Sequence, residues 1–291
     1  MSAHARSDSR PRSPHDGGAV VKSDPGLHDL RWYHSIDLPD GSTTPGEYDL
    51  RAIVAKLPLP ASMEGMRCLD VGSRDGFYAF EMERRGAAEV ISLDIEDPDD
   101  VHFPGVTRPD RALIEKELAD GHAAFDAAAT ALGSCVQREL RSVYDLPELG
   151  LLRFDFAVIG TLLLHLRDPL RALDGVRAVL GGRLLLNEPV TPGFLSVVPV
   201  PSAELLMQEG PFWRLCNPAG QRRLVEAAGF RILDSSRPYI IPAGRGGRRI
   251  LGLAETVKAG SLRSLPTRLV QRRGILHAWI LASTAGYSSA R

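Results

Sequence analysis

The chain has 291 residues, of which 44% are hydrophobic and 24% charged, and its formal net charge is −1. These values are typical of one large globular α/β domain or two small ones, and they exclude a broad basic field for nucleic acid. No apolar run reaches the roughly 18 residues that a membrane span needs, and the polar N-terminus lacks the apolar core of a secretory signal. We therefore expect a cytoplasmic protein without membrane contact.

Cysteine usage excludes two further classes of protein. The chain has only three cysteines, at positions 68, 135 and 216, and no C-x-x-C pair. An odd and sparse set argues against a disulfide framework, and the missing pair argues against a zinc site. We expect no bound metal and a reducing compartment.

The predicted elements begin after a polar tail. Residues 1 to about 27 are rich in Ser, Arg, Pro, Asp and Gly, which predicts disorder. Six short apolar runs predict strands at 66–71, 89–94, 154–160, 183–188, 230–233 and 275–282. Three amphipathic runs predict helices at 77–85, from Pro169 up to Gly181, and from Pro218 up to Gly229.

Strands and helices that alternate in this way indicate an α/β fold with a mostly parallel sheet covered on both faces. Two segments do not fit this core, a Pro-rich stretch at 191–216 and a Gly/Arg-rich stretch at 240–271. Both follow late strands, where the loops at the carboxyl end of a parallel sheet cover a substrate. We interpret them as insertions that form part of a substrate site.

The strongest motif is the loop that follows the first strand, Leu69-Asp70-Val71-Gly72-Ser73-Arg74-Asp75-Gly76. Gly72 and Gly76 let the backbone approach a ligand that a side chain would block. A dinucleotide fingerprint would read G-x-G-x-x-G, but here the central glycine is missing and two carboxylates flank the loop. Carboxylates repel phosphates and suit an ammonium group, such as the methionine end of S-adenosylmethionine (SAM). The alternative is a glycine loop without a ligand.

Two later acids extend this interpretation to an adenosine. Asp94 ends the second strand, where an acid accepts both hydroxyls of a ribose; alternatively it only opens a solvated acidic loop. Asp145 precedes the strand at 154–160 and could take the adenine amino group, with Leu146 covering a face of the ring. The alternative for Asp145 is a residue that initiates a turn before Leu-Pro.

The segment Gly160-Thr161-Leu162-Leu163-Leu164-His165-Leu166-Arg167-Asp168-Pro169 follows the strand at 154–160. His165 is a candidate general base for a hydroxyl, because its ordinary pKa is near 6.5; alternatively it packs structurally beside the cofactor. His34 and His277 are further candidates for the base.

From Trp32 to Glu188 the chain resembles class I SAM-dependent methyltransferases, and within them the group around the bacterial tRNA wobble-uridine (5-carboxymethoxyuridine) methyltransferase. The matching pieces include Trp32-Tyr33-His34-Ser35-Ile36-Asp37, Tyr48-Asp49-Leu50-Arg51 and the motifs above. The resemblance implies a Rossmann-like, mostly parallel seven-stranded sheet at 66–291, capped over the cofactor by residues 28–65. The implied cofactor-binding residues are Asp70, Gly72, Ser73, Gly76, Asp94, Ile95, Asp145, Leu146 and Gly160.

The sequence differs from that tRNA enzyme at positions that bear on the cofactor. The tRNA enzyme that uses carboxy-SAM reads the extra carboxylate with a lysine, a tyrosine and an arginine. Here Leu164 stands at the tyrosine position, His277 aligns with the arginine, and no lysine lies between Lys22 and Lys56. A leucine cannot donate to a carboxylate, and burying an unpaired charge is costly. We therefore expect ordinary SAM and transfer of a methyl group.

Three hypotheses about function stay open. A small hydroxylated metabolite is favoured as acceptor, because no Asn/Asp-Pro-Pro-aromatic motif for an exocyclic amine is present and Phe194, Phe212 and Trp213 could form a closed aromatic pocket. A tRNA is the alternative acceptor, since nine Lys/Arg and only one acid, Glu255, lie between Arg237 and Arg273. That stretch can also be a solvated surface. The third hypothesis is a SAM-binding protein without catalysis.

Overall fold

The structure is a computed structural model that describes residues 26–27, 29–105, 108–150, 153–206, 210–247 and 274–284. Its strands are β1 (Arg67–Val71), β2 (Glu89–Asp94), β3 (Gln137–Leu140), β4 (Phe154–Gly160), β5 (Leu180–Pro189), β6 (Ala203–Leu205), β7 (Arg214–Cys216), β8 (Phe230–Ser235), β9 (Tyr239–Pro242) and β10 (Gly274–Thr284). Its α-helices are α1 (Arg51–Val54), α2 (Phe77–Arg84), α3 (Arg111–Leu132), α4 (Pro169–Val179) and α5 (Pro218–Ala227). Short 3-10 helices are η1 (Pro98–Asp100), η2 (Val143–Leu149), η3 (Leu163–His165) and η4 (Gly193–Ser196).

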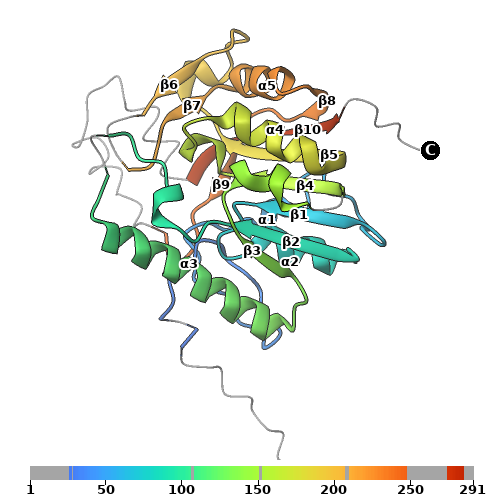
Figure 1. Ribbon diagram of the computed structural model, residues 1–291, viewed down its shortest axis with the longest axis vertical. Coiled ribbons are helices and arrows are strands. Elements are labelled where there is room, and N and C mark those ends of the chain that lie inside the picture. The colour runs from blue at the N-terminus through green and yellow to red at the C-terminus, as the bar shows by residue number, and fades with distance from the viewer. Residues whose placement is uncertain are drawn as a thin grey trace, which may run out of the picture.

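One mixed sheet organises these elements. Its order is β3-β2-β1-β4-β5-β10-β8, and β9 pairs with β10 outside this path (Figure 1). The strands from β3 to β5 are parallel, whereas β10 is antiparallel to β5, β8 and β9. The predicted Rossmann-like, mostly parallel seven-stranded sheet is confirmed, with β9 as an additional short strand.

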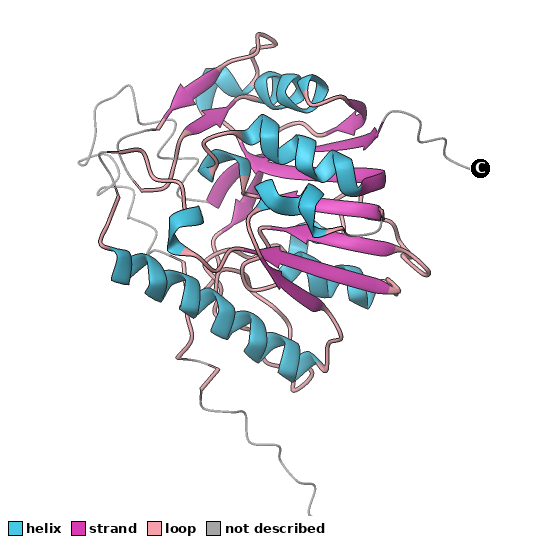
Figure 2. Ribbon diagram, in the orientation of Figure 1, coloured by secondary structure: helices cyan, strands magenta, loops and turns pink. Residues whose placement is uncertain are grey.

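Helices cover both faces of the sheet (Figure 2). On one face, α2, α3 and the N-terminal segment pack into a core that contains Trp32 and Phe125. On the other face, α4, α5 and η2 pack into a second core that contains Leu173 and Val225. None of the helices in the described ranges is long and apolar enough to cross a membrane.

Both predicted helix starts are confirmed by their caps. The Asp168 side chain accepts the backbone N–H of Arg171 at 3.0 Å, and Pro169 opens α4. The Asn217 side chain accepts the N–H of Gly220 at 2.7 Å before α5. A capping side chain followed by proline satisfies one free N–H and removes another, so these sequences begin helices where they do.

The predicted end of the first capped helix is wrong. We expected it to run up to Gly181, but α4 ends at Val179 and β5 begins at Leu180. Gly181 and Gly182 belong to β5 instead. Gly182 allows close pairing with β4, because a Cβ there would lie 1.9 Å from the carbonyl oxygen of Asp155. We also did not predict α3 and β3; the β3 sequence is short and half-buried, and lacks the apolar alternation of a strand.

The boundaries of two predicted segments also change. Leu27, assigned to the disordered tail, is partly buried against the core and accepts the indole N–H of Trp32. Residues 240–242 of the second predicted insertion belong to β9. The rest of the predicted tail, residues 1–25, and residues 248–273 lie outside the described part of the chain.

We predict that Gly182→Ala destabilises the protein by about 2 kcal/mol or more, because the new methyl group meets backbone atoms of β4 that cannot move aside. Denaturant unfolding followed by circular dichroism measures this. Gly105→Ala is the matched control, since nothing lies within 4 Å of its Cβ position. Equal stability of the two variants would contradict the packing argument.

Candidate functional site

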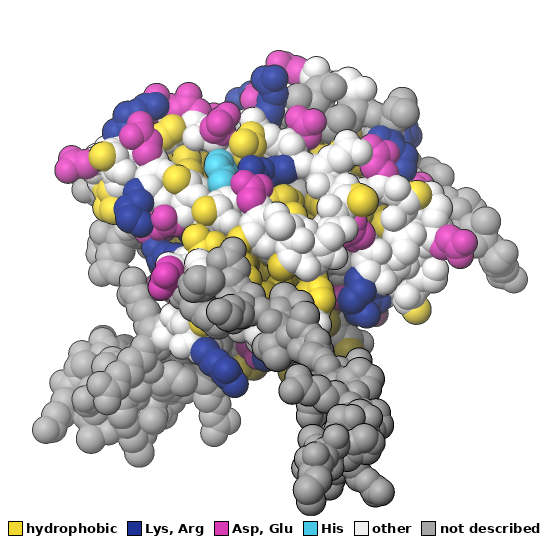
Figure 3. All heavy atoms as spheres, turned by 90° about the horizontal axis from the view of Figure 1, so that it is seen from below, with side chains coloured by type: hydrophobic (Ala, Val, Ile, Leu, Met, Phe, Trp, Pro, Cys, Tyr) yellow, Lys and Arg dark blue, Asp and Glu magenta, His cyan; other side chains and the backbone are white. Residues whose placement is uncertain are grey.

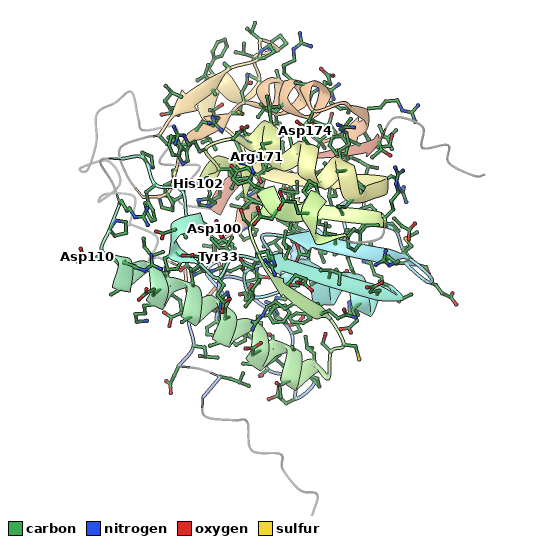
Figure 4. All side chains as sticks on the ribbon, viewed as in Figure 1. Tyr33, Asp100, His102, Asp110, Arg171 and Asp174 are labelled. Atoms are coloured by element: carbon green, nitrogen blue, oxygen red, sulfur yellow. The ribbon has the colours of Figure 1, made fainter. Side chains whose placement is uncertain are left out.

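The segments that follow β1, β2, β3, β4 and β5 meet at one edge, the carboxyl end of the parallel strands. This edge carries Asp94 and Glu188 in the last residues of β2 and β5, and Gly72, Asp145 and His165 in the segments after β1, β3 and β4. In Figure 4 the labelled Tyr33, Asp100 and His102 lie at this end of the sheet. Open α/β sheets bind ligands at this edge, so we treat it as the candidate active site.

The glycine loop after β1 has three residues with positive φ, a backbone conformation that favours glycine. Gly72 and Gly76 have φ values of 73° and 85°, and Arg74 between them has 54°. Gly72 is half-exposed, and a Cβ there would meet Leu162 at 3.0 Å. Gly76 is buried, and a Cβ there would meet the Phe80 ring at 2.6 Å. Gly72 therefore leaves room for Leu162 at the edge, whereas Gly76 leaves room for the buried aromatic rings.

Asp70 and Ser73 are buried beneath the loop, and their predicted role in cofactor binding stays a prediction. Asp70 is 1% exposed and accepts the N–H of Ala79 in α2 at 3.0 Å. Burial raises the pKa of Asp70 to about 8. The Ser73 hydroxyl bonds that of Ser92 at 2.5 Å. Both residues therefore stabilise the loop through hydrogen bonds on its buried side.

Asp94 and Ile95 remain partly exposed at the end of β2. The Asp94 carboxylate accepts the N–H of Arg74 at 2.9 Å and that of Ile95 at 2.8 Å. Burial raises the pKa of Asp94, although these contacts and nearby His122 favour its charged form. A carboxylate has about four acceptor sites, so two remain for hydroxyl groups of a ligand.

The two residues predicted to hold an adenine are placed differently. Asp145 is half-exposed in η2, and its charge adds to the burial that raises the pKa of Asp100. Leu146 is 0% exposed and lies in the core beneath α4. Asp145 is thus accessible and Leu146 enclosed, and the assignment of both to an adenine stays a prediction.

The segment after β4 brings His165 to the edge. Gly160 has no side chain, and this leaves room for the Tyr78 ring, since a Cβ at position 160 would lie 2.6 Å from that ring. The His165 Nδ1 lies 3.0 Å from the carbonyl oxygen of Pro211, so Nδ1 carries the proton and Nε2 has a lone pair. Its ring packs against Phe212, with the ring centroids 5.1 Å apart. Burial lowers the pKa of His165 to about 4, so the ring is neutral at physiological pH.

Glu188 holds this segment in place, and sequence reasoning missed it. Its Oε1 accepts the N–H groups of Leu162 at 2.6 Å and Leu163 at 3.0 Å. Burial raises the pKa of Glu188 to about 7. An acid at the end of a buried strand is the same signal that singled out Asp94, so the pattern could have found it.

His277 is buried beside the same segment. Its Nδ1 faces the carbonyl oxygen of Ile275 at 3.2 Å, and its Nε2 lies 3.1 Å from the Thr161 hydroxyl. Burial lowers the pKa of His277 to about 4, so its neutral ring accepts the hydroxyl proton of Thr161. Thr161 has a φ of 58°, a strained value for a β-branched residue. His277 thus supports the backbone next to His165.

A series of side-chain hydrogen bonds links β5 to α2 and β9. Asn187, at the end of β5, donates to the Tyr78 hydroxyl at 2.7 Å and accepts from the Tyr239 hydroxyl at 2.6 Å. It therefore ties α2 and β9 to the centre of the sheet edge.

His34 ties the N-terminal segment to the glycine loop. Asp75 is 0% exposed and accepts the N–H groups of Tyr33 at 2.8 Å and His34 at 2.7 Å. The His34 Nδ1 donates to the second oxygen of Asp75 at 2.5 Å. The three candidate histidines thus have different hydrogen-bond partners. His34 joins the N-terminal segment to the glycine loop after β1.

The predicted aromatic pocket of the 191–216 insertion is only partly formed. Phe194 is 80% exposed, so it does not join Phe212 and Trp213. Phe212 contacts His165, and the Trp213 indole N–H donates to the carbonyl oxygen of His102 at 3.0 Å. Two of the three aromatic residues therefore lie beside the site.

The predicted basic surface between Arg237 and Arg273 falls mostly outside the described residues. On the face seen in Figure 3, acidic and basic side chains are interspersed and neither sign forms a continuous field. A phosphate backbone would need a basic surface, so this face does not favour one.

The sheet order and the glycine loop beside an acid at the end of β2 define a class of protein, the SAM-dependent methyltransferases with a Rossmann-like fold. The chain belongs to the methyltransferase domain family whose model matches residues 45–235, more than half of its length. At the edge, Gly72 is half-exposed and the Asp94 carboxylate keeps acceptor sites beside its two backbone contacts, so the residues present are compatible with SAM. SAM is the methyl donor of this class of enzyme.

Several solved structures resemble the chain. The 1,6-didemethyltoxoflavin-N1-methyltransferase of Burkholderia thailandensis, with bound 1,6-didemethyltoxoflavin and S-adenosylhomocysteine, is 16% identical with a TM-score of 0.46; 76% of this chain and 72% of that chain are covered. The arsenic(III) SAM methyltransferase of Chlamydomonas reinhardtii is 18% identical with a TM-score of 0.40, covering 79% and 68%. A putative methyltransferase of Bacillus halodurans is 13% identical with a TM-score of 0.48, covering 80% and 97%.

At these identities none of the three bears on the substrate. A search of curated protein sequences found no match. No comparison singles out the tRNA wobble-uridine group that the sequence motifs suggested, so only the wider class of that resemblance is confirmed.

We predict that Glu188→Gln removes a pH dependence of stability. The pKa of Glu188 rises from 4.5 to about 7 on folding, so the folded wild type binds an extra proton between these values. Its free energy of unfolding therefore falls as pH rises through that window. Gln keeps an acceptor for the two backbone N–H groups without the buried charge. The stability of the variant relative to wild type should rise by on the order of 2–3 kcal/mol from about pH 5 to about pH 8.

Urea unfolding at a series of pH values measures this difference. Exposed Glu96 provides the control variant Glu96→Gln, which should follow wild type at every pH. A Glu188→Gln curve parallel to that of wild type would show that Glu188 does not titrate in this window.

Proposed function

We propose that the protein transfers the methyl group of SAM to an oxygen atom of a small hydroxylated metabolite. The observation that carries this proposal is the state of His165 at the carboxyl end of β4. Its Nδ1–H is taken by the carbonyl oxygen of Pro211, which fixes the ring and leaves the Nε2 lone pair without a partner among the described residues. A hydroxyl acceptor needs a base in this state.

SAM supplies a methyl group on a positively charged sulfur, which is a good leaving group. His165 takes the hydroxyl proton of the acceptor at Nε2 while the oxygen attacks the methyl carbon. Burial lowers the pKa of His165 to about 4, so the ring is unprotonated before the reaction throughout the physiological range. Glu188 holds the backbone of Leu162 and Leu163 and so positions His165.

The cofactor-binding residues divide into two groups. The partly exposed ones are proposed to contact SAM, with the backbone at Gly72 and Gly160, with Asp94 and Ile95 at the ribose, and with Asp145 at the adenine. The buried ones hold the loop and the core in place, and these are Asp70, Ser73, Gly76 and Leu146. This division follows from accessibility, because a ligand cannot touch a side chain that is enclosed by protein.

A small molecule is favoured over tRNA as acceptor. Acidic and basic groups alternate over the surface seen in Figure 3, and the acidic segment Asp94–Asp100 lies close to the edge of the sheet. Phosphate-backbone binding is driven by clustered Lys and Arg. Leu164 in place of the carboxylate-reading tyrosine further separates this chain from the tRNA enzyme that uses carboxy-SAM.

We predict that Asp94→Ala weakens SAM binding by about 1–3 kcal/mol, because hydrogen bonds from the ribose hydroxyls are lost. Gly72→Val should abolish binding, since a β-branched residue at a φ of 73° is strained and its side chain would collide with Leu162, which distorts the loop at the edge. Calorimetry with SAM measures both, and Glu96→Ala in the same acidic loop is the control. Wild-type affinity in both site variants would refute the assignment of the SAM site.

We predict that His165→Gln lowers methyl transfer by about 10²–10⁴-fold while SAM affinity stays within about twofold of wild type, because the base acts on the acceptor. The assay follows labelled methyl groups from SAM into separate metabolite and tRNA fractions. Undiminished transfer by the variant would show that no base at His165 is needed, and label retained on tRNA alone would replace the small-molecule acceptor.

A further inference from the structure

A cavity of about 490 Å³ lies at the start of α4, apart from the residues assigned to SAM. Its lining residues are His102, Tyr144, Arg167, Asp168 and Arg171. They come from three segments, after η1, within η2 and at the junction of η3 with α4. Figure 4 shows the labelled His102 and Arg171 close together at this junction. A volume of this size accommodates a small ligand or a large part of one.

Two arginines of the lining have no acidic partner. Some arginines nearby are paired with acids, as Arg111 is with Asp97 and Asp99. Arg167 and Arg171 form no ion pair with any residue that the structure describes. An unpaired pair of guanidinium groups in one hollow is a ready site for an anion.

Aromatic rings hold both guanidinium groups in place. The Arg171 guanidinium carbon lies 4.8 Å from the centre of the Tyr144 ring, and that of Arg167 lies 5.9 Å from the centre of the Trp213 ring. A guanidinium group on an aromatic face keeps its N–H edge free for a planar, two-point contact with an oxyanion.

Two neutral donors complete the lining. The His102 Nδ1 accepts the backbone N–H of Arg167 at 3.3 Å, so in the neutral ring the proton sits on Nε2. The Tyr144 oxygen accepts the N–H of Asp168 at 3.1 Å, and no described residue takes its hydroxyl proton. The cavity therefore offers donors from four side chains.

Asp168 is the one carboxylate among the lining residues, and it is already used. Its side chain accepts the backbone N–H of Arg171 and caps α4. The helix end is thus closed by the protein itself, so anion binding would depend on the side chains rather than on the helix dipole. Nearby Asp100 adds an acid beside His102, but two arginines still balance it and Asp168.

We propose that this cavity binds a phosphate group, and that this group belongs to the methyl acceptor. Two guanidinium groups and two neutral donors offer hydrogen bonds from four side chains, which suits the several oxygens of a phosphate group better than the two oxygens of a carboxylate. The assignment to the acceptor rests on the proposed function. It would make the substrate a phosphorylated hydroxy metabolite, held by its phosphate at one end and methylated on a hydroxyl at the other.

The link between cavity and methyl-transfer site is Trp213. Its backbone N–H donates to the carbonyl oxygen of Leu164 at 2.9 Å, next to His165. Its indole N–H donates to the carbonyl oxygen of His102, and its ring carries Arg167. Adjacent Phe212 packs on His165. One short stretch of chain therefore shapes both places, as expected if one molecule occupies them.

Calorimetric titration with inorganic phosphate tests the cavity directly. Wild type should bind phosphate, Arg171→Gln should bind about tenfold more weakly or worse, and Arg167→Gln/Arg171→Gln should show no binding. Arg177→Gln on the same helix, outside the cavity, should match wild type. No phosphate binding by wild type, or unchanged binding by the double variant, would overturn the proposal. Binding of acetate as tight as that of phosphate would overturn the preference for a dianion.

A second experiment tests the acceptor. Labelled SAM is incubated with wild type and a small-metabolite fraction, before and after treatment of that fraction with phosphatase. Label should be lost after treatment, and the double variant should transfer at least tenfold less while binding SAM normally. Equal labelling of treated and untreated fractions, or label on tRNA, would show that the acceptor carries no phosphate into this cavity. If the protein bound phosphate but not SAM, the proposed function would fail while the cavity assignment stood.

Discussion

The buried carboxylate of Asp75 is the contact on which the site depends. It is enclosed by protein and accepts three hydrogen bonds, two from the backbone of Tyr33 and His34 and one from the His34 ring. Removing a buried charge from water is costly, so such a group persists only when its oxygens are satisfied. By satisfying it, the N-terminal segment is fixed against the glycine loop. The shape of the loop and the position of the segment over it therefore depend on each other.

The strand ends behind this loop carry a second set of buried polar contacts. Glu188 holds the backbone after β4, His277 supports the strained Thr161, and Asn187 joins tyrosines from α2 and β9. The raised pKa of Glu188 shows that its charge is poorly tolerated by its surroundings. A protein that needed only stability would favour apolar residues here, so the cost is consistent with a requirement for a fixed active-site edge.

The hairpin of β6 and β7 forms a separate two-stranded sheet beside the candidate site. Just before β7, the Trp213 backbone N–H and the Phe212 ring contact the loop after β4 at Leu164 and His165. The Trp213 indole contacts His102 in the segment after η1. The sheet and the glycine loop are features of the whole class of methyltransferases. Specificity among acceptors resides in the variable elements that cover the carboxyl end of the sheet, because these contact the part of the ligand that is not SAM.

The sequence alone determined the alternation of strands and helices, both capped helix starts, the glycine loop and the acid at the end of β2. These depend on short-range patterns of apolar, capping and glycine residues. Only the tertiary structure decided which residues face the edge. Asp70 and Leu146 belong to the right motifs but point into the protein, Phe194 is exposed, and Glu188 gains its role from the backbone of another segment. Side-chain direction and burial are set by packing between distant segments, whereas a motif records only neighbours along the chain.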